Sequence, residues 1–264
     1  MAFGDGIWHW PTAILCLFGA LLLQIGTNLV NDYFDFKKGA DTAERKGPIR
    51  VTQAGLIKPL HMMIGIIITF LLASIVSYFV YQRGGLPIAV IAVTSILSAI
   101  LYTAGPKPLG YLGLGDIFVF IFFGPVAVAG TYYVQSFEMN LGVILAGIAP
   151  GLFSAGILAV NNLRDIDTDR KSNKKTLAVR FGKDFAKMEY LFCMIGACLI
   201  PVLVYSVTMD HPATLLCVTI AIFSIPTLNN VLNASRGEEL NKELATTGIL
   251  LFVYSILFSI GWII

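Results

Sequence analysis

Acidic and amide side chains gather in the stretch Asn28–Asp41, which ends a long apolar run and contains two Asn and three Asp residues. If the apolar run is a helix, Asn28 and Asp32 lie on one face, with Asn31 and Asp35 one step around it. Carboxylates packed this closely repel one another unless cations lie between them. Acidic groups at a membrane helix are costly, which makes them candidates for function. This stretch alone predicts either a metal site or a polar helix end.

A second stretch repeats the pattern. Asn161, Asp165 and Asp169 are spaced four residues apart, so on a helix all three lie along one face. Each stretch ends an apolar run and leads into a long basic loop, at residues 36–59 and 164–187. The two apolar runs are four apart in the chain and therefore run in the same direction, as a parallel internal repeat requires.

Two facing acid clusters fit the binding of a diphosphate through metal ions. Mg²⁺ takes oxygen ligands and is commonly held by one or two carboxylates together with substrate phosphates. Basic side chains from the adjoining loops would neutralise the charge that grows on a departing diphosphate. The alternative is that both clusters are solvated helix ends of mixed charge. The matched spacing on one side of the membrane favours the metal site.

The composition places these clusters in a membrane protein. The chain of 264 residues is 56% hydrophobic and 13% charged, with a mean hydropathy of +0.79, whereas soluble domains carry about 25% charged residues. The net charge of +2 gives no reason to expect nucleic acid as a partner. The four cysteines lie in apolar runs without a CxxC pair, and we interpret them as packing residues. No basic segment precedes the first apolar run, so no signal peptide is expected.

We expect one all-α domain over residues 1–264, built as a polytopic bundle of transmembrane helices. Apolar runs long enough to cross a bilayer, about 20 residues each, occur eight times, at Pro11–Tyr33, His61–Tyr81, Leu86–Thr103, Gly115–Gln135, Leu141–Leu163, Met188–Thr208, Pro212–Val231 and Ala245–Ile264.

The connections between these runs differ sharply in charge. Every Lys and Arg except Arg83 lies around the connections after the first, third, fifth and seventh runs. By the positive-inside rule, these connections face the cytoplasm and both ends of an eight-span chain lie outside. Both acidic stretches then face the cytoplasm, which predicts an active site on that side of the cell membrane.

The two acidic stretches resemble the paired aspartate-rich motifs of the UbiA superfamily of intramembrane prenyltransferases. The resemblance covers essentially the whole chain. It rests on NDYFDFKKGAD at 31–41, GPIRVTQ at 47–53, YTAGPKPLGY at 102–111, NNLRDIDTD at 161–169 and KKTLAVRFG at 174–182. The segments at 31–41 and 47–53 are most similar to those of the menaquinone branch, the 1,4-dihydroxy-2-naphthoate polyprenyltransferases.

The resemblance implies a helical bundle whose two acid motifs face each other at the cytoplasmic end of a cavity open towards lipid. It implies Mg²⁺ as cofactor, with polyprenyl diphosphate and an aromatic acceptor as substrates. The implied metal ligands are Asn28, Asp32, Asp35, Asp41, Asn161, Asp165 and Asp169, among which Asp32, Asp35, Asp165 and Asp169 would be catalytic. The implied substrate-binding residues are Asn28, Arg45, Arg50, Tyr102, Lys107, Tyr111, Arg164, Lys174 and Arg180.

The sequence departs from the family pattern in two places. The family usually has nine spans, and here Met1 falls just before what would be the second, so we expect a chain that is short at its N-terminus. In a nine-span parent the N-terminus would be cytoplasmic. In the first motif, Phe36 replaces the third member of the Asn-x-x-x-Asp-x-x-x-Asp pattern. Asp35 or Asp41 would then substitute for it.

Other functions remain open on the sequence. The acceptor could be 4-hydroxybenzoate or homogentisate, as among the relatives. A cation-coupled transporter would use acid pairs near a repeat interface, although transporter sites usually lie at mid-bilayer in broken helices. A non-catalytic lipid-binding relic would fit the missing first span. The prenyl chain length and the oligomeric state are not determined by the sequence.

Overall fold

The computed structural model describes residues 1–40 and 46–264, and all regular structure in these ranges is helical, as the sequence predicts. The helices are α1 (Trp10–Lys37), α2 (Pro59–Leu101), η1 (Gly110–Leu112), α3 (Gly115–Ile121), η2 (Phe122–Val126), α4 (Ala127–Ser136), α5 (Leu141–Arg164), α6 (Ile166–Lys171), α7 (Leu177–Phe181), α8 (Lys183–Thr208), η3 (Pro212–Thr219), α9 (Ile220–Asn233), η4 (Gly237–Glu239) and α10 (Leu240–Ile263).

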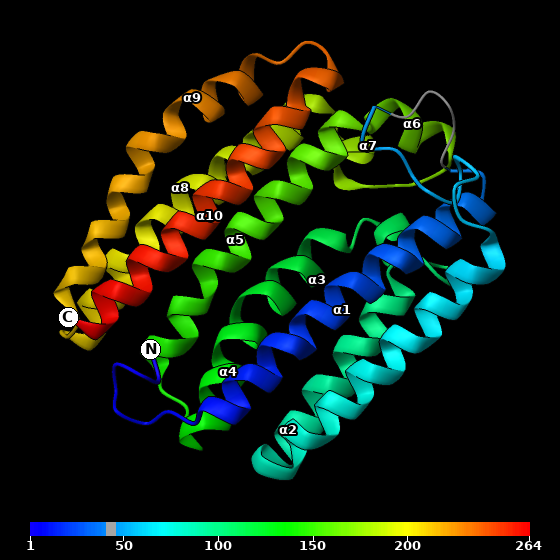
Figure 1. The fold of residues 1–264 in the computed structure, drawn as a ribbon. Coiled ribbons are helices and arrows are strands. Elements are labelled where there is room, and N and C mark those ends of the chain that lie inside the picture. The colour runs from blue at the N-terminus through cyan, green and yellow to red at the C-terminus, as the bar shows by residue number, and fades with distance from the viewer. Residues whose placement is uncertain (41–45) are drawn as a thin grey trace.

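Helix α2 is two membrane-crossing helices joined at Gly85. A straight helix of its 43 residues would be about 65 Å long, twice the thickness of a bilayer core. Gly85 has φ 65° and ψ −154°, a conformation open to glycine alone. The ribbon doubles back there (Figure 1). Seven helices in the described ranges are long and apolar enough to cross a membrane, and the division of α2 brings the crossings to the eight expected.

One span changes its helical type halfway. The predicted run Gly115–Gln135 consists of α3, the π-helical turn η2 and α4. Within η2, Gly124 has non-helical backbone angles and Pro125 lacks an N–H donor. A Cβ added at Gly124 would lie 2.6 Å from the carbonyl oxygen of Gly147. The chain therefore crosses α5 at a point where only glycines allow the two backbones to approach.

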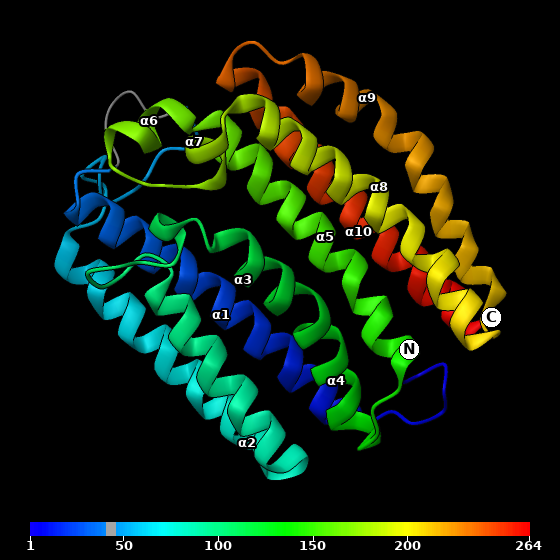
Figure 2. The ribbon, with the colours of Figure 1, turned by 180° about the vertical axis from the view of Figure 1, so that it is seen from behind.

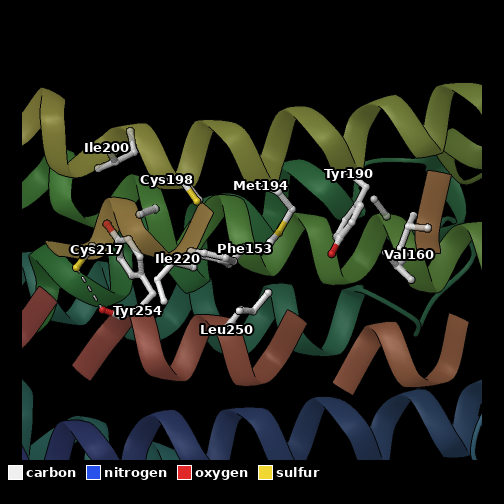
Figure 3. Packing of buried hydrophobic residues seen from close by; sticks show 14 of the residues in the cluster. Phe153, Val160, Tyr190, Met194, Cys198, Ile200, Cys217, Ile220, Leu250 and Tyr254 are labelled. Atoms are coloured by element: carbon white, nitrogen blue, oxygen red, sulfur yellow. Dashed lines mark hydrogen bonds between the residues drawn. The ribbon is translucent and has the colours of Figure 1, made fainter. Parts of the chain in front are cut away.

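Helix α5 is the centre of the bundle. It lies between α8 and α10 on one side and α3 and η2 on the other (Figures 1 and 2). The core on the α8 side contains the fully buried Phe153, Tyr190 and Met194 (Figure 3). Large apolar side chains elsewhere point outward, including many on α1 and α2. An apolar outer surface is expected of a bundle whose solvent is lipid.

The two ends of the bundle differ in character. Both chain ends lie at one end, whereas α6, α7, the start of α2 and the α9–α10 turn gather at the other (Figure 1). Near the chain ends, Asp5 accepts hydrogen bonds from the Tyr132 hydroxyl (2.6 Å) and the Trp262 indole N–H (2.7 Å). This carboxylate ties the N-terminal segment to α4 and α10. The opposite end carries both acidic motifs.

Candidate active site

A polar cavity of about 140 Å³ lies at the end of the bundle where α1, α2 and α5 finish. Its walls come from both acidic motifs and from the loops that follow them. The lining residues of most chemical interest are Asn31, Asp35, Arg50, Tyr102, Thr103, Tyr111, Asn161, Asp165, Thr168, Asp169 and Lys174. The structure thus brings together the two stretches that the sequence predicted to face each other.

Among the described residues of the first motif, Asp35 is the acid that reaches the cavity. Its side chain is buried, accepts a hydrogen bond from the Tyr111 hydroxyl (2.8 Å), and pairs with the Lys174 ammonium (2.9 Å). The ammonium groups of Lys38 and Lys174 also lie 4.6 and 5.0 Å from the centre of the Tyr111 ring. Burial lowers the pKa of Lys38, against the opposing effect of the Asp35 charge. One carboxylate and one aromatic ring therefore hold two cations beside the cavity.

The second motif keeps its predicted spacing across a break between two helices. Helix α5 ends at Arg164 and α6 begins at Ile166, yet the backbone N–H groups of Asp165 and Asp169 still bond the carbonyls four residues earlier, at 3.1 and 2.8 Å. Asn161, Asp165 and Asp169 all line the cavity.

A buried arginine accompanies these acids. Arg164 donates to both oxygens of Asp165, from Nε at 2.8 Å and from Nη2 at 2.6 Å. Nη2 also donates to the side-chain oxygen of Asn161 (2.7 Å). A bidentate contact from an arginine is stronger than a single hydrogen bond and fixes the orientation of the carboxylate. The carboxylate of Asp165 is therefore paired with a cation from its own motif.

Asp32 has different contacts from Asp35. Its two oxygens accept the backbone N–H groups of Val51 and Thr52, each at 3.1 Å. It is buried but is not among the lining residues of the cavity. Asp32 thereby fixes the loop that follows α1 and, with it, Arg50 on the cavity wall.

The remaining predicted residues divide into three groups. Tyr102 lines the cavity. Asn28 and Lys107 are exposed and do not line the cavity, and Arg180 donates to the carbonyls of Lys175 and Leu112 at 3.0 and 2.8 Å. Asp41 and Arg45 lie outside the described residues.

Several residues in or beside the cavity were not singled out from the sequence as site residues. The hydroxyl of Thr103 donates to the side-chain oxygen of Asn31, which joins α1 to the end of α2. Lys38 donates to the carbonyl of Thr103 (2.6 Å), and Thr168 and Thr176 also line the cavity. Asn31 could have been found, because it lies within the first motif. Threonines carry no such signal, since their role depends on which segments meet.

The donor set fits Mg²⁺ bound together with a phosphate ligand. In the described part of the chain, no group of three or more His, Cys, Asp or Glu side chains converges as a complete metal cage. The cavity instead offers carboxylate and amide oxygens from two motifs. Mg²⁺ is commonly held by one or two carboxylates, with substrate phosphates and waters completing the shell.

Comparison with known families agrees with this geometry. Residues 1–256 match the UbiA prenyltransferase family. The chain belongs to this family. Among relatives, it is 36% identical over 263 residues to a 1,4-dihydroxy-2-naphthoate octaprenyltransferase of Haemophilus influenzae, covering 95% of this chain and 83% of the relative. It is 33% identical over 249 residues to the protein of the same name from Mycobacterium tuberculosis, covering 94% and 83%.

A solved structure of the UbiA family shares the fold. A UbiA homologue from Archaeoglobus fulgidus bound to DMAPP and Mg²⁺ superimposes with a TM-score of 0.64 at 15% identity, covering 98% of this chain and 92% of that chain. The family assignment and the all-helical membrane fold predicted from the sequence are both confirmed.

Proposed function

We propose that this protein transfers a polyprenyl group from polyprenyl diphosphate to 1,4-dihydroxy-2-naphthoate, with loss of carbon dioxide, in menaquinone biosynthesis. The observation that carries the proposal is the single cavity lined by Asp35, Asp165 and Asp169 together with Arg50 and Lys174. The names of the relatives support the naphthoate acceptor. The Archaeoglobus structure with DMAPP and Mg²⁺ supports a prenyl diphosphate donor and a divalent metal.

The metal would be held by the cavity oxygens of Asp35, Asn161, Asp165 and Asp169. When bound, Mg²⁺ supplies positive charge that binds the diphosphate and polarises its oxygens. Arg50 and Lys174 also line this cavity, and their charges would stabilise the diphosphate as it departs. Arg164 orients Asp165 through two hydrogen bonds.

The reaction breaks the bond between the prenyl carbon and oxygen and the bond between the ring and the carboxylate, and it forms one new carbon–carbon bond. The bond between the first prenyl carbon and the diphosphate oxygen breaks, and its electron pair leaves with the diphosphate. The ring carbon that carries the carboxylate attacks the allylic carbon. The bond to the carboxylate then breaks, carbon dioxide leaves, and the electron pair restores the aromatic ring. Exclusion of water by the enclosed site protects the allylic cation from hydrolysis.

Two tyrosines are placed to position the acceptor. Tyr102 and Tyr111 line the cavity. A tyrosine hydroxyl is protonated at neutral pH, so that of Tyr102 can donate a hydrogen bond to an acceptor oxygen. The contributions of Asn28, Asp41, Arg45, Lys107 and Arg180 to substrate or metal binding remain predictions. We further propose that the protein lies in the cell membrane with its cavity on the cytoplasmic side.

The direct test uses membranes that contain the full chain. They are incubated with radiolabelled polyprenyl diphosphate, Mg²⁺ and dihydroxynaphthoate. We expect label in demethylmenaquinone only when Mg²⁺ is present. Parallel reactions with 4-hydroxybenzoate and homogentisate test the acceptor. Preferred labelling of either one would overturn the naphthoate assignment, and absence of label from all three would overturn prenyl transfer itself.

A further inference from the structure

Three segments that are distant in sequence meet beside the cavity. They are residues 46–47 of the loop after α1, Arg164 at the end of α5, and the turn that contains η4 and the start of α10. The turn lies at the same end of the bundle as α6 and α7 (Figures 1 and 2). The turn between α9 and α10 contains neither acidic motif, so sequence reasoning gave it no role.

Asn241 joins the three segments with its side chain. Its oxygen accepts a hydrogen bond from Nη1 of Arg164 (3.0 Å), and its nitrogen donates to the carbonyl of Lys46 (2.9 Å). The amide therefore uses both of its ends. A carboxylate could replace only the first contact, because it cannot donate to a carbonyl.

The arginine held by Asn241 is the one that orients the second motif. Arg164 is 3% exposed. On the side away from Asn241, it donates to Asp165 and Asn161, both of which line the cavity. A guanidinium is a planar fork, so a contact that fixes one nitrogen also fixes the direction of the others.

Glycines at the junction allow the segments to approach closely. A Cβ added at Gly47 would lie 2.8 Å from Nη2 of Arg164, and one added at Gly237 would lie 2.6 Å from the Arg164 carbonyl oxygen and 2.8 Å from Cδ of Lys46. The first of these atoms belongs to a side chain, but the Arg164 carbonyl is backbone and cannot move aside without moving the end of α5.

The turn does not need Asn241 for its own shape. The backbone N–H groups of Ser235 and Arg236 donate to the side chain of Glu239, at 3.3 and 3.4 Å. These bonds close the turn within itself. The Asn241 side chain instead serves contacts outside the turn.

We propose that Asn241 is a positioning residue for the diphosphate site. It holds the Arg164 guanidinium so that Asp165 and Asn161 present their oxygens to the cavity. It also holds the loop at Lys46, four residues before Arg50 on the cavity wall. The α9–α10 turn thus contributes to the diphosphate site. The inference rests on the proposed function, because it assigns the diphosphate to this cavity.

The test compares full-length Asn241→Ala with Asn233→Ala. Asn233 is an exposed amide on α9 that, within the described part of the chain, donates only to the Asn229 carbonyl (2.9 Å). We expect Asn241→Ala to raise KM for polyprenyl diphosphate about tenfold, as the loss of one hydrogen bond to a charged group predicts. Its kcat should change less than twofold. Asn233→Ala should match the wild type in both constants.

A binding measurement separates this inference from the function. The affinity of each purified variant for inorganic pyrophosphate with Mg²⁺ is measured by calorimetry, without any acceptor. Asn241→Ala should bind about tenfold more weakly than wild type, and Asn241→Asp should lie between them, because it keeps only the Arg164 contact. A wild type that binds pyrophosphate but prenylates no acceptor overturns the proposed function, while the variants still decide the role of Asn241.

Glycine variants provide a second route that leaves Asn241 intact. Gly237→Ala should weaken pyrophosphate binding as Asn241→Ala does, because it displaces the same junction. Gly248→Ala, where an added Cβ meets nothing within 4 Å, should have no effect. Normal pyrophosphate affinity and KM in Asn241→Ala, with only a lower melting temperature, would assign Asn241 a structural role and overturn the inference.

Discussion

At the scale of single residues, the site is organised by pairing acids with donors, which come from another segment for Asp35 and Asp32 and from the same motif for Asp165. Asp35 of the first motif pairs with Lys174, which follows the second motif. Asp165 is held by Arg164, and Asp32 by the backbone of the loop after α1. Buried carboxylates are tolerated when charge and hydrogen bonds compensate them. We propose that the cavity cations Arg50 and Lys174 also bind the diphosphate.

Removing a cavity carboxylate should abolish catalysis without removing the protein from the membrane. Asp165→Ala should lower kcat/KM by roughly 100-fold or more, the scale on which active-site electrostatic groups act. The matched control is Asp167→Ala, because Asp167 is exposed and, among the described residues, its side chain makes only a 3.4 Å contact with Lys46. We expect the control to stay within about twofold, since surface ion pairs contribute little. Prenyl transfer by membranes with equal protein content measures both.

Two adjacent lysines should differ in their effect on stability. Lys174→Met leaves the buried Asp35 carboxylate without its ion pair and should lower the free energy of unfolding by about 3 kcal/mol. Lys175→Met, at an exposed neighbour, should change it by less than about 0.5 kcal/mol. Thermal melting in detergent compares the two variants. Equal melting temperatures would show that the Asp35–Lys174 pair contributes nothing to the fold.

At the scale of elements, one glycine decides the path of two helices. Gly85 turns the 43-residue segment α2 back on itself. The following residues include Pro87, which is tolerated in the first turn of the returning helix because that N–H has no partner there. The hairpin returns the chain to the cavity end, where Tyr102 and Thr103 line the cavity wall.

Replacing this glycine should destabilise the hairpin. Gly85 has a positive φ and an extended ψ, and a non-glycine residue in this region costs of order 1–3 kcal/mol. Gly85→Ala should therefore melt at a lower temperature than wild type, although no atom lies within 4 Å of the added Cβ. Gly248→Ala, which also meets no atom but lies in a regular helix, should melt no lower than wild type.

At the scale of the whole molecule, polarity is confined to one end of an otherwise apolar bundle. Basic connections, both acidic motifs and the polar cavity share that end, and the outer surface elsewhere is largely apolar. The bundle can therefore sit in a bilayer with its reactive end at one face.

This arrangement predicts the orientation of the chain. Single cysteines at Lys183 and Glu138 would lie at opposite ends, because both residues are exposed and α8 begins near the cavity while α4 ends far from it. The native cysteines are free, with three buried and Cys16 half-buried. A membrane-impermeant maleimide should label Glu138→Cys on intact cells, and Lys183→Cys only after permeabilisation. The reverse pattern would place the cavity outside.

Metal removal should stop the reaction reversibly. Chelation by EDTA should abolish prenyl transfer, and added Mg²⁺ should restore it, because the cavity carboxylates need a counter-charge to bind a diphosphate. Pyrophosphate with Mg²⁺ should raise the melting temperature, whereas pyrophosphate in EDTA should not. Full activity in EDTA would contradict the assignment of the acids to metal binding.

The sequence by itself determined the membrane-spanning fold, the eight crossings and the two acidic motifs at one end. Hydropathy identifies the spans because each must place apolar side chains in lipid while its backbone groups bond to one another within the helix. A four-residue spacing places residues on one helix face whatever surrounds the helix. The sequence could not show which side of α1 faces the cavity. Asn28 and Asp32 share a face in sequence, yet neither lines the cavity, whereas Asp35 does.

Only the tertiary structure decided the partners of the predicted residues. Thr103, Lys38 and Asn241 reach the site because distant segments converge there, and no local pattern encodes such a meeting. The rotation of a helix and the docking of a loop depend on packing against every neighbour at once. Sequence spacing therefore identified the acids, while the packing of helices and loops selected which of them meet and what holds them in place.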